Sequence, residues 1–179
     1  MKQIFVVNGQ QYETIKLLGH GKGGYSFLAK GPKGLVVVKK IHHEKCDYYQ
    51  FGNKIEAESF DYQRLADLGI RMPKMIDIDY KQELIVKEYI DGSVVADLIK
   101  KQQDVSKYIP QVVFMAELAK AKNLNIDYYP TNFVIQNEIL YYIDYECNNY
   151  SDEWNFENWG IKYWTGEKPL NWDDTIPIC

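Results

Sequence analysis

The sequence predicts an α+β protein in which an antiparallel sheet with one helix comes first and a mainly helical part follows. Three observations indicate this class. Strand-like segments joined by short turns fill residues 4–41, and a helical pattern follows at about 52–68. After Asp91-Gly92 the strand-rich pattern ends and apolar residues recur at helical spacing. We therefore expect one domain at 1–90 and a second at 91–179.

The strands of the first domain follow from alternation and turn residues. Asn8-Gly9 is a strong hairpin signal, and Gly31-Pro32-Lys33-Gly34 forms a second turn. The run 35–41 is apolar on both faces, which predicts a central strand covered on both sides. The expected strands are 4–7, 12–18, 25–30, 35–41, 75–80 and 83–89.

The helices follow from three- and four-residue apolar spacing. Ile55, Tyr62 and Leu65 predict one face of the helix at 52–68, and Gly69 supplies its end. Further helices are expected at 94–101 and 106–122, followed by a hairpin of strands 133–135 and 139–143. We expect the tryptophans of the tail to anchor it by burial. They are Trp154, Trp159, Trp164 and Trp172.

Composition excludes several classes of protein. The net charge is −4, whereas a nucleic-acid-binding protein usually carries a basic surface, so we expect no nucleic-acid partner. The N-terminal residues lack the apolar length of a signal peptide, and no run reaches the roughly 20 apolar residues of a membrane span. Three widely spaced cysteines argue against a disulfide framework. We expect a cytoplasmic protein without a membrane partner.

A glycine cluster at 19–24 fits the pattern G-x-G-x-x-G through Gly19, Gly21 and Gly24. Glycines allow the backbone to approach phosphate groups closely. A dinucleotide-binding fingerprint requires a helix directly after the glycines, and here a strand follows. A plain glycine-rich hairpin is the alternative interpretation.

Two charged residues on apolar elements are expected to pair. Lys39 and Lys40 end the covered strand, where a buried cation requires an acidic partner or an anionic ligand, and alternation does not choose between them. Glu58 lies on the apolar face of the helix at 52–68, whereas Glu56 lies on another face. By contrast, a metal site at His42-His43-Glu44 is not expected, because adjacent histidines point to opposite sides of an extended chain, and a solvated loop is predicted instead.

The most specific segment contains Asp127, Pro130 and Asn132, with Asp144 seventeen residues after the first aspartate. This pattern resembles the catalytic loop and the metal-binding element of protein kinases. The segment around Asp144 has the Ile-Asp-aromatic-Glu form seen in aminoglycoside-phosphotransferase-like kinases. On these motifs the chain is identified as a member of the protein-kinase-like superfamily, as a compact atypical bacterial-type Ser/Thr kinase with RIO-like features.

The resemblance implies a bilobal protein-kinase-like fold with an antiparallel-sheet N-lobe, one helix and a reduced, mainly helical C-lobe. It also implies a site for ATP and Mg²⁺. The implied catalytic residues are Asp127, Lys39 and Glu58. The implied ATP-binding residues are Gly19, Gly21, Gly24, Val37, Lys39, Glu88 and Ile90. The implied Mg²⁺ ligands are Asn132 and Asp144.

Three positions depart from the protein-kinase pattern. Asn125 replaces the usual histidine, Tyr129 replaces a lysine, and Lys87 stands where an apolar residue is common. The expected function is that of a Mg-ATP-dependent phosphotransferase, a minimal serine/threonine protein kinase. Its acceptor is a hydroxyl group on a protein or a small molecule, and its oligomeric state is left open. The alternatives are a small-molecule kinase of the aminoglycoside or choline type and a non-catalytic nucleotide-binding pseudokinase.

Overall fold

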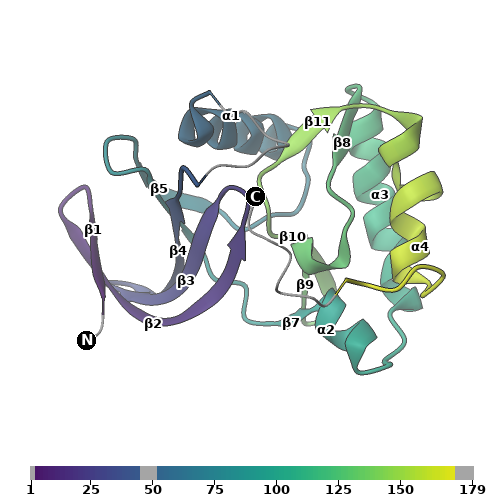
Figure 1. Cartoon of the computed structure of the whole chain (residues 1–179), viewed down its shortest axis with the longest axis horizontal. Helices are drawn as coiled ribbons and strands as arrows, with labels where there is room; N and C mark the ends of the chain where they lie inside the picture. Colours follow the sequence, from purple (N-terminus) through teal and green to yellow (C-terminus); the bar gives the residue numbers. More distant parts are fainter. Residues whose placement is uncertain (1–2, 45–51, 172–179) are drawn as a thin grey trace. The chain divides into compact units, whose positions relative to one another are not determined.

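The computed structural model describes residues 3–44 and 52–171, and it is an α+β protein (Figure 1). The chain forms two compact units. Of the described residues, the first contains 3–44, 52–58 and 74–89, and the second contains 59–73 and 90–171. The α+β class expected from the sequence is confirmed. Among the described residues, no helix has both the length and the apolar character needed to span a bilayer.

The first unit is built on a six-stranded sheet whose neighbouring strands all pair antiparallel. Their order is β1-β2-β3-β4-β6-β5, and the sheet is strongly curled (Figure 1). The strands are β1 Ile4–Val7, β2 Gln10–Gly21, β3 Gly24–Gly31, β4 Gly34–Ile41, β5 Met75–Asp79 and β6 Leu84–Glu88.

The turns and the core of this sheet follow the sequence closely. Asn8 and Gly9 both have positive φ, 46° and 84°, as the two-residue turn between β1 and β2 requires. Residues Val36 to Lys39 of β4 are all buried, which confirms the expected covered strand. The core of the sheet consists of Phe5, Val7, Tyr12, Ala29, Val36, Val38, Leu84 and Val86.

Helix α1, Lys54–Asp67, corresponds to the helix expected at 52–68. Asn53 precedes it, and its side-chain oxygen accepts a hydrogen bond from the Glu56 amide at 3.2 Å, which caps the first turn. Gly69 ends the helical segment with a φ of 78°. Leu65 is fully buried in the core of the second unit.

The second unit combines helices with two small sheets, ordered β10-β9-β7 and β11-β8. Asn137 and Glu138 both have positive φ in the turn between β9 and β10, which confirms the expected hairpin. The strands are β7 Ser93–Val94, β8 Leu124–Ile126, β9 Phe133–Gln136, β10 Ile139–Tyr142 and β11 Cys147–Asn149. The helices are α2 Val95–Lys100, α3 Ile109–Lys120 and α4 Ile161–Trp164, and the short helical turns are η1 Ser106–Tyr108, η2 Pro130–Asn132, η3 Asp152–Trp154 and η4 Phe156–Gly160.

The tail is anchored through one of its tryptophans. Trp164 is buried, and its indole Nε1 donates a hydrogen bond to the Tyr128 carbonyl at 2.9 Å. Trp154 is 52% exposed, so the expected burial is wrong there, although its ring packs against Trp159. Trp172 lies outside the described residues. Anchoring by Trp164 fixes the tail against the loop that carries Asp127.

Candidate active site

Asp127 lies in the second unit, directly after strand β8 and before the helical turn η2. Its Oδ1 accepts a hydrogen bond from the Tyr129 amide at 3.0 Å, so the side chain is held by its own loop. Asn132 donates from Nδ2 to the Asp127 carbonyl at 3.4 Å, and the Asn132 amide donates to the Tyr129 carbonyl at 2.9 Å. These bonds hold Asp127 and Asn132 in one tight turn.

Tyr142 supports this turn from the end of β10. Its side chain is fully buried, and its hydroxyl accepts a hydrogen bond from the Asp127 amide at 3.3 Å. The same hydroxyl donates to the Glu146 carbonyl at 2.8 Å. One phenol group therefore joins the Asp127 loop to the segment that carries Asp144 and Glu146. Burial raises the pKa of Tyr142 well above its usual value, so the hydroxyl keeps its proton.

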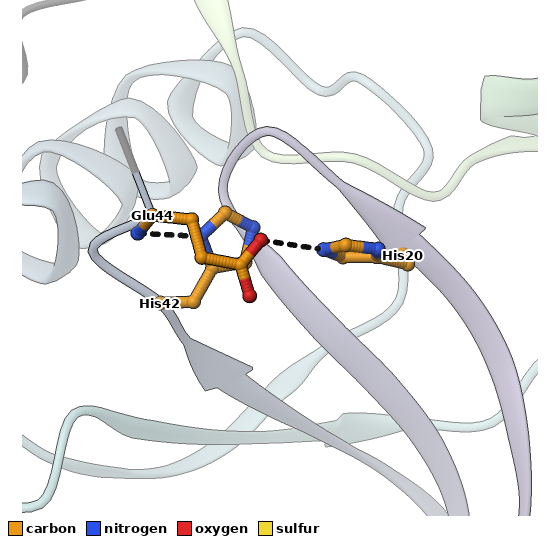
Figure 2. A group of neighbouring side chains, drawn as sticks. All are labelled: His20, His42 and Glu44. Atoms are coloured by element: carbon orange, nitrogen blue, oxygen red, sulfur yellow. Dashed lines mark hydrogen bonds and ion pairs between the residues drawn. The ribbon is translucent and has the colours of Figure 1, made fainter. Parts of the chain in front are cut away.

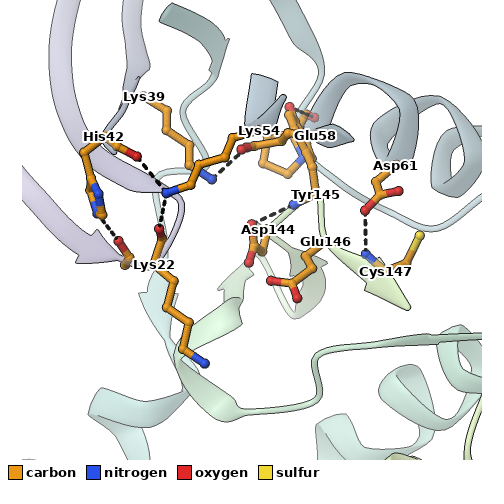
Figure 3. Close-up of polar contacts among 12 residues, drawn as sticks. Lys22, Lys39, His42, Lys54, Glu58, Asp61, Asp144, Tyr145, Glu146 and Cys147 are labelled. Carbon is orange, nitrogen blue, oxygen red and sulfur yellow. Dashed lines mark hydrogen bonds and ion pairs between the residues drawn. The ribbon is translucent and has the colours of Figure 1, made fainter. Parts of the chain in front are cut away.

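Asp144 lies just beyond β10, and its own segment is fixed in several ways (Figure 3). Its Oδ1 accepts from the Tyr145 amide at 2.9 Å, and the Ile143 amide donates to the Asn132 carbonyl at 2.9 Å. Tyr145 is fully buried, with its hydroxyl on the Pro73 carbonyl at 2.7 Å and its ring 4.6 Å from that of Tyr62. The structure thus brings the segments of Asp127, Asn132 and Asp144 together within one unit.

The electrostatics of this cluster act mainly on Asp127. Its pKa is raised to about 6: burial and the negative charges of Asp144 and Glu146 raise it, whereas hydrogen bonds from Tyr129 and Asn132 oppose the rise. Asp127 is therefore a carboxyl group that exchanges its proton close to neutral pH. Strongly shifted pKa values of this kind concentrate at functional sites, although structural networks also produce them.

The donor set of the cluster fits a hard divalent cation. Asp127, Asp144 and Glu146 lie close enough for the two latter charges to disfavour ionisation of the first. A bound cation would relieve that repulsion. Asn132 uses its amide nitrogen on the loop, so its amide oxygen is a ligand atom of the same hard type. Carboxylate and amide oxygens are the ligands that Mg²⁺ takes in proteins.

In the first unit, Lys39 and Glu58 form a nearly buried ion pair (Figure 3). Lys39 Nζ lies 2.7 Å from Glu58 Oε1, and each side chain is 11% exposed. Lys40 and Glu56, their neighbours in the sequence, are both exposed. The pair expected from the sequence is present, and the structure selects Lys39 over Lys40.

The glycine cluster forms a two-residue turn, Lys22-Gly23, between paired residues Gly21 and Gly24. A side chain on Gly23 would place its Cβ 3.2 Å from Lys39 Nζ and 3.9 Å from Glu58 Oε2. The turn therefore lies directly against the ion pair. A Cβ on Gly24 would meet the Lys40 carbonyl oxygen at 2.3 Å, whereas one on Gly19 or Gly21 would meet nothing within 4 Å.

The other predicted nucleotide contacts lie on or beyond the central strands of the same sheet. Val37 is buried on β4, opposite Lys87 of β6. Glu88 is the last residue of β6, and its Oε2 accepts from the Lys74 amide at 3.1 Å. Ile90 is buried and belongs to the second unit. The nucleotide-binding roles of these residues, like those of Gly19, Gly21 and Gly24, stay predictions.

Two of the three departures from the protein-kinase pattern have structural roles in this chain. Asn125 is buried on β8 and donates from Nδ2 to the Ser151 carbonyl at 2.9 Å. The Tyr129 hydroxyl accepts from the Asn171 amide at 2.9 Å. Lys87 is buried on β6. Asn125 and Tyr129 thus tie the Asp127 loop to the tail of the chain.

Sequence reasoning missed three residues of these clusters. Tyr142 falls within a predicted strand, Gly23 lies between the glycines of the motif, and Glu146 is the last residue of the Ile-Asp-aromatic-Glu segment, so the pattern gives none of them a role. A signal existed for Gly23, since it belongs to the same glycine run. For Tyr142 the signal was weak, because a tyrosine at the end of an apolar strand does not reveal which amide its hydroxyl reaches.

Comparison with known proteins gives two matching relatives from archaea, both named probable bifunctional tRNA threonylcarbamoyladenosine biosynthesis proteins. The relative from Methanocaldococcus jannaschii is 29% identical over 116 residues, which is 65% of this chain and 21% of the relative. The relative from Methanococcus vannielii is 28% identical over 89 residues, which is 49% of this chain and 16% of the relative. No protein-family model matches the chain. The match therefore spans about a fifth or less of these relatives.

These relatives correct the interpretation of the motifs. The resemblance indicated a compact, atypical Ser/Thr kinase with RIO-like and aminoglycoside-phosphotransferase-like features. That assignment is wrong, because the relatives are named for tRNA threonylcarbamoyladenosine biosynthesis, which is a different role from that of a free-standing kinase. The motif residues are shared by enzymes of more than one role, so they could not separate the two.

Proposed function

We propose that this chain is a magnesium- and ATP-dependent phosphotransferase that serves tRNA threonylcarbamoyladenosine biosynthesis. One observation carries the chemical part of the proposal. Asp127 is held by the Tyr129 amide and braced by Tyr142, and its pKa is raised to about 6 beside Asp144 and Glu146. A carboxylate with these properties fits a group that takes a proton from an acceptor hydroxyl.

Asp127 is suited to this task by its pKa and by its fixed position. Near pH 7 it is mostly ionised, yet it is basic enough to share the proton of a hydroxyl group as that group attacks. Its Oδ1 accepts from the Tyr129 amide, which fixes the orientation of the carboxylate that we propose as the proton acceptor. Loss of this carboxylate should therefore slow transfer more than it weakens nucleotide binding.

Asn132 and Asp144 are the residues that we propose as ligands of Mg²⁺. When bound, the ion would draw charge from the phosphate oxygens, which is the main requirement of phosphoryl transfer. The bond from Ile143 to Asn132 holds the two ligand segments at a fixed spacing. Glu146 adds a negative charge to the same cluster.

In the first unit, we propose that Lys39 contacts the phosphates of ATP while Glu58 fixes the position of its ammonium group. The Glu58 carboxylate lies 2.7 Å from the Lys39 ammonium, and this contact sets the direction of the other N–H groups of the ammonium. The Lys22-Gly23 turn lies against this pair, and its backbone amides are donors of the kind that bind phosphate. We also propose that the sheet and its helix are arranged as in protein kinases.

The role in tRNA threonylcarbamoyladenosine biosynthesis is supported by the names of the two archaeal relatives. We propose a hydroxyl group on a protein or a small molecule as the phosphoryl acceptor. The net charge of −4 favours such an acceptor over direct binding of the tRNA backbone.

The experiment that tests the proposal follows the γ-phosphate of radiolabelled ATP in the presence and absence of Mg²⁺. We expect the wild-type chain to transfer or release label only with Mg²⁺. Asp144→Asn should lower the rate at least tenfold and weaken the dependence of ATP binding on Mg²⁺. Asp97→Asn removes an exposed acid of the same unit and should behave as wild type. Tight ATP binding without any turnover would instead support the pseudokinase alternative.

A further inference from the structure

Two histidines and a glutamate converge in the first unit at the end of strand β2 and just beyond strand β4 (Figure 2). His20, His42 and Glu44 each offer a ligand atom, and these atoms lie within 4.8 Å of one another. The sequence placed His42 in a solvated loop. That interpretation is wrong for His42, which is 8% exposed, and right for His43, whose side chain is 60% exposed.

Strand pairing explains why residues so far apart in sequence meet. His20 pairs with Tyr25 across β2 and β3, and Tyr25 pairs with Lys40 across β3 and β4. His42 lies two residues after Lys40, directly beyond the end of β4, and its ring lies 5.1 Å from that of His20. His20 also stacks on Tyr25 with ring centroids 3.9 Å apart. The position of the imidazole of His20 is therefore fixed by the sheet.

The hydrogen bonds of His42 leave its Nδ1 with a lone pair. His42 Nε2 lies 2.8 Å from the Gly21 carbonyl oxygen, which can only accept, so Nε2 carries the hydrogen. Nδ1 then accepts a hydrogen bond from the Glu44 amide at 3.3 Å, a long bond that a metal ion would have to displace. An imidazole that donates its other N–H to a backbone carbonyl is the usual arrangement of a metal-binding histidine.

His20 supplies a second, independent observation. Within the described part of the chain its Nε2 is buried and makes no hydrogen bond. The nearest acidic oxygen, Glu44 Oε2, is 3.6 Å away, which is too long for one. A buried polar atom without a hydrogen bond costs roughly 1–3 kcal/mol, so a ligand that satisfies it would be favoured.

Glu44 is held with one oxygen toward the histidines. Its Oε1 accepts from the Tyr25 hydroxyl at 2.6 Å. Its Oε2 lies on the side of His20. The nearby ammonium of Lys54 is engaged by the His42 carbonyl at 2.7 Å and the Lys22 carbonyl at 3.3 Å (Figure 3).

We propose that His20 Nε2, His42 Nδ1 and the Glu44 carboxylate bind one divalent transition-metal ion, with Zn²⁺ as the favoured ion. Two imidazoles and one carboxylate suit Zn²⁺, whereas Mg²⁺ and Ca²⁺ prefer oxygen ligands alone. Tetrahedral bonds of about 2.0–2.1 Å separate ligand atoms by about 3.4 Å, so ligand atoms that lie within 4.8 Å of one another need to close by about 1.4 Å at most. A fourth position is left for water.

Such an ion would join the end of β2 to the segment after β4. The inference does not rest on the proposed function, because metal binding is measured without nucleotide. The competing interpretation is a hydrogen-bonded and ionic cluster of the same three side chains, which would bind no metal. Only the metal-site interpretation predicts stoichiometric Zn²⁺ binding.

The test is calorimetric titration of the metal-free full chain with Zn²⁺. We expect the wild type to bind one ion, and His20→Gln, His42→Gln and Glu44→Gln each to weaken binding at least tenfold. His43→Gln is the matched control, because His43 lies next to His42 but pairs with Glu83 and is exposed; it should bind as wild type. With Co²⁺, the visible spectrum should show nitrogen and oxygen ligation without a thiolate charge-transfer band.

Three results would overturn the proposal: no stoichiometric Zn²⁺ binding by the wild type, binding by His20→Gln or Glu44→Gln equal to wild type, or a thiolate band in the Co²⁺ spectrum. Circular dichroism of the metal-free variants checks that they are folded. Because His42 is buried, His42→Gln is the variant most prone to misfold. Glu44→Gln, at a carboxylate that is 42% exposed, carries the test in that case.

Discussion

The hydroxyl of Tyr142 accepts a hydrogen bond from the backbone amide of Asp127 at 3.3 Å. The same oxygen donates to the Glu146 carbonyl at 2.8 Å, so the position of Asp127 depends on a residue fifteen positions later in the chain. Tyr142 is a positioning residue, since it acts through Asp127 rather than on a substrate.

Tyr142→Phe removes this hydroxyl while keeping the ring. We expect the free energy of unfolding to fall by about 1–3 kcal/mol, because a buried amide and a buried carbonyl lose their shared partner. The turnover rate should fall while the KM for ATP changes little. Chemical denaturation and steady-state kinetics measure the two effects.

Tyr141→Phe is the control, because within the described residues the Tyr141 hydroxyl makes no hydrogen bond while its ring faces Arg71. Equal kinetics for Tyr142→Phe and wild type would show that the brace does not act on catalysis.

The raised pKa of Asp127 makes stability depend on pH. Its pKa is about 6 in the fold and about 3.8 as the ordinary value, so between these pH values the folded state binds more protons than the unfolded one. Stability from this group is therefore present below pH 4 and is lost as pH rises through 6. Asp127→Asn should be more stable than wild type at pH 7, by roughly 1–3 kcal/mol, and the difference should shrink toward pH 4.

Thermal unfolding of wild type and Asp127→Asn between pH 4 and 7.5 measures this difference. A constant difference across that range would contradict the raised pKa. If ionised Asp127 takes the acceptor proton, kcat/KM should also rise with pH through an apparent pKa near 6.

The role of the Lys39–Glu58 pair can be tested by comparing a substitution at Glu58 with one at Glu56, which lies on the same helix. Glu58→Gln removes the charge that faces a nearly buried ammonium group, and breaking such a pair costs about 3–5 kcal/mol. Since both side chains are 11% exposed, we expect the lower end of that range together with a raised KM for ATP. Glu56→Gln, at an exposed position of α1, should leave both stability and KM unchanged.

Gly23, within the Lys22-Gly23 turn, and Gly21, directly before it, offer a second matched pair. Gly23→Ala places a Cβ 3.2 Å from the Lys39 ammonium, which must then shift, whereas Gly21→Ala meets nothing within 4 Å. We expect Gly23→Ala to weaken ATP binding several-fold at little cost in stability, and Gly21→Ala to bind as wild type. Isothermal titration with ATP decides the point. A larger loss of ATP affinity in Gly21→Ala than in Gly23→Ala would favour phosphate binding by the G-x-G-x-x-G motif glycines over binding by the Lys22-Gly23 turn.

Local features of the fold were predictable because they depend on neighbouring residues. The turn at Asn8-Gly9 was predictable because asparagine and glycine tolerate positive φ. Helix α1, which Gly69 follows, was predictable from its apolar spacing. Glu58 could be assigned to the inner side of α1 for the same reason. Each of these decisions requires a window of only a few residues.

Contacts between distant segments could not be predicted from such short windows of sequence. The convergence of His20 with His42 depends on the register of β2, β3 and β4 together. The reach of the Tyr142 hydroxyl to Asp127 depends on the packing of β8 and β10 segments, which no periodicity encodes. Alternation correctly separated His42 from His43 but could not show which one lies against another strand.

The measurement that tests the central claim most directly is single-turnover consumption of γ-labelled Mg-ATP by wild type and by Asp127→Asn. If Asp127 takes the acceptor proton, the variant should bind ATP within about threefold of wild type and lose at least a hundredfold in rate, as removal of an acid–base group does. Asp97→Asn should match wild type in both. Equal rates for Asp127→Asn and wild type would contradict the proposed function at its centre.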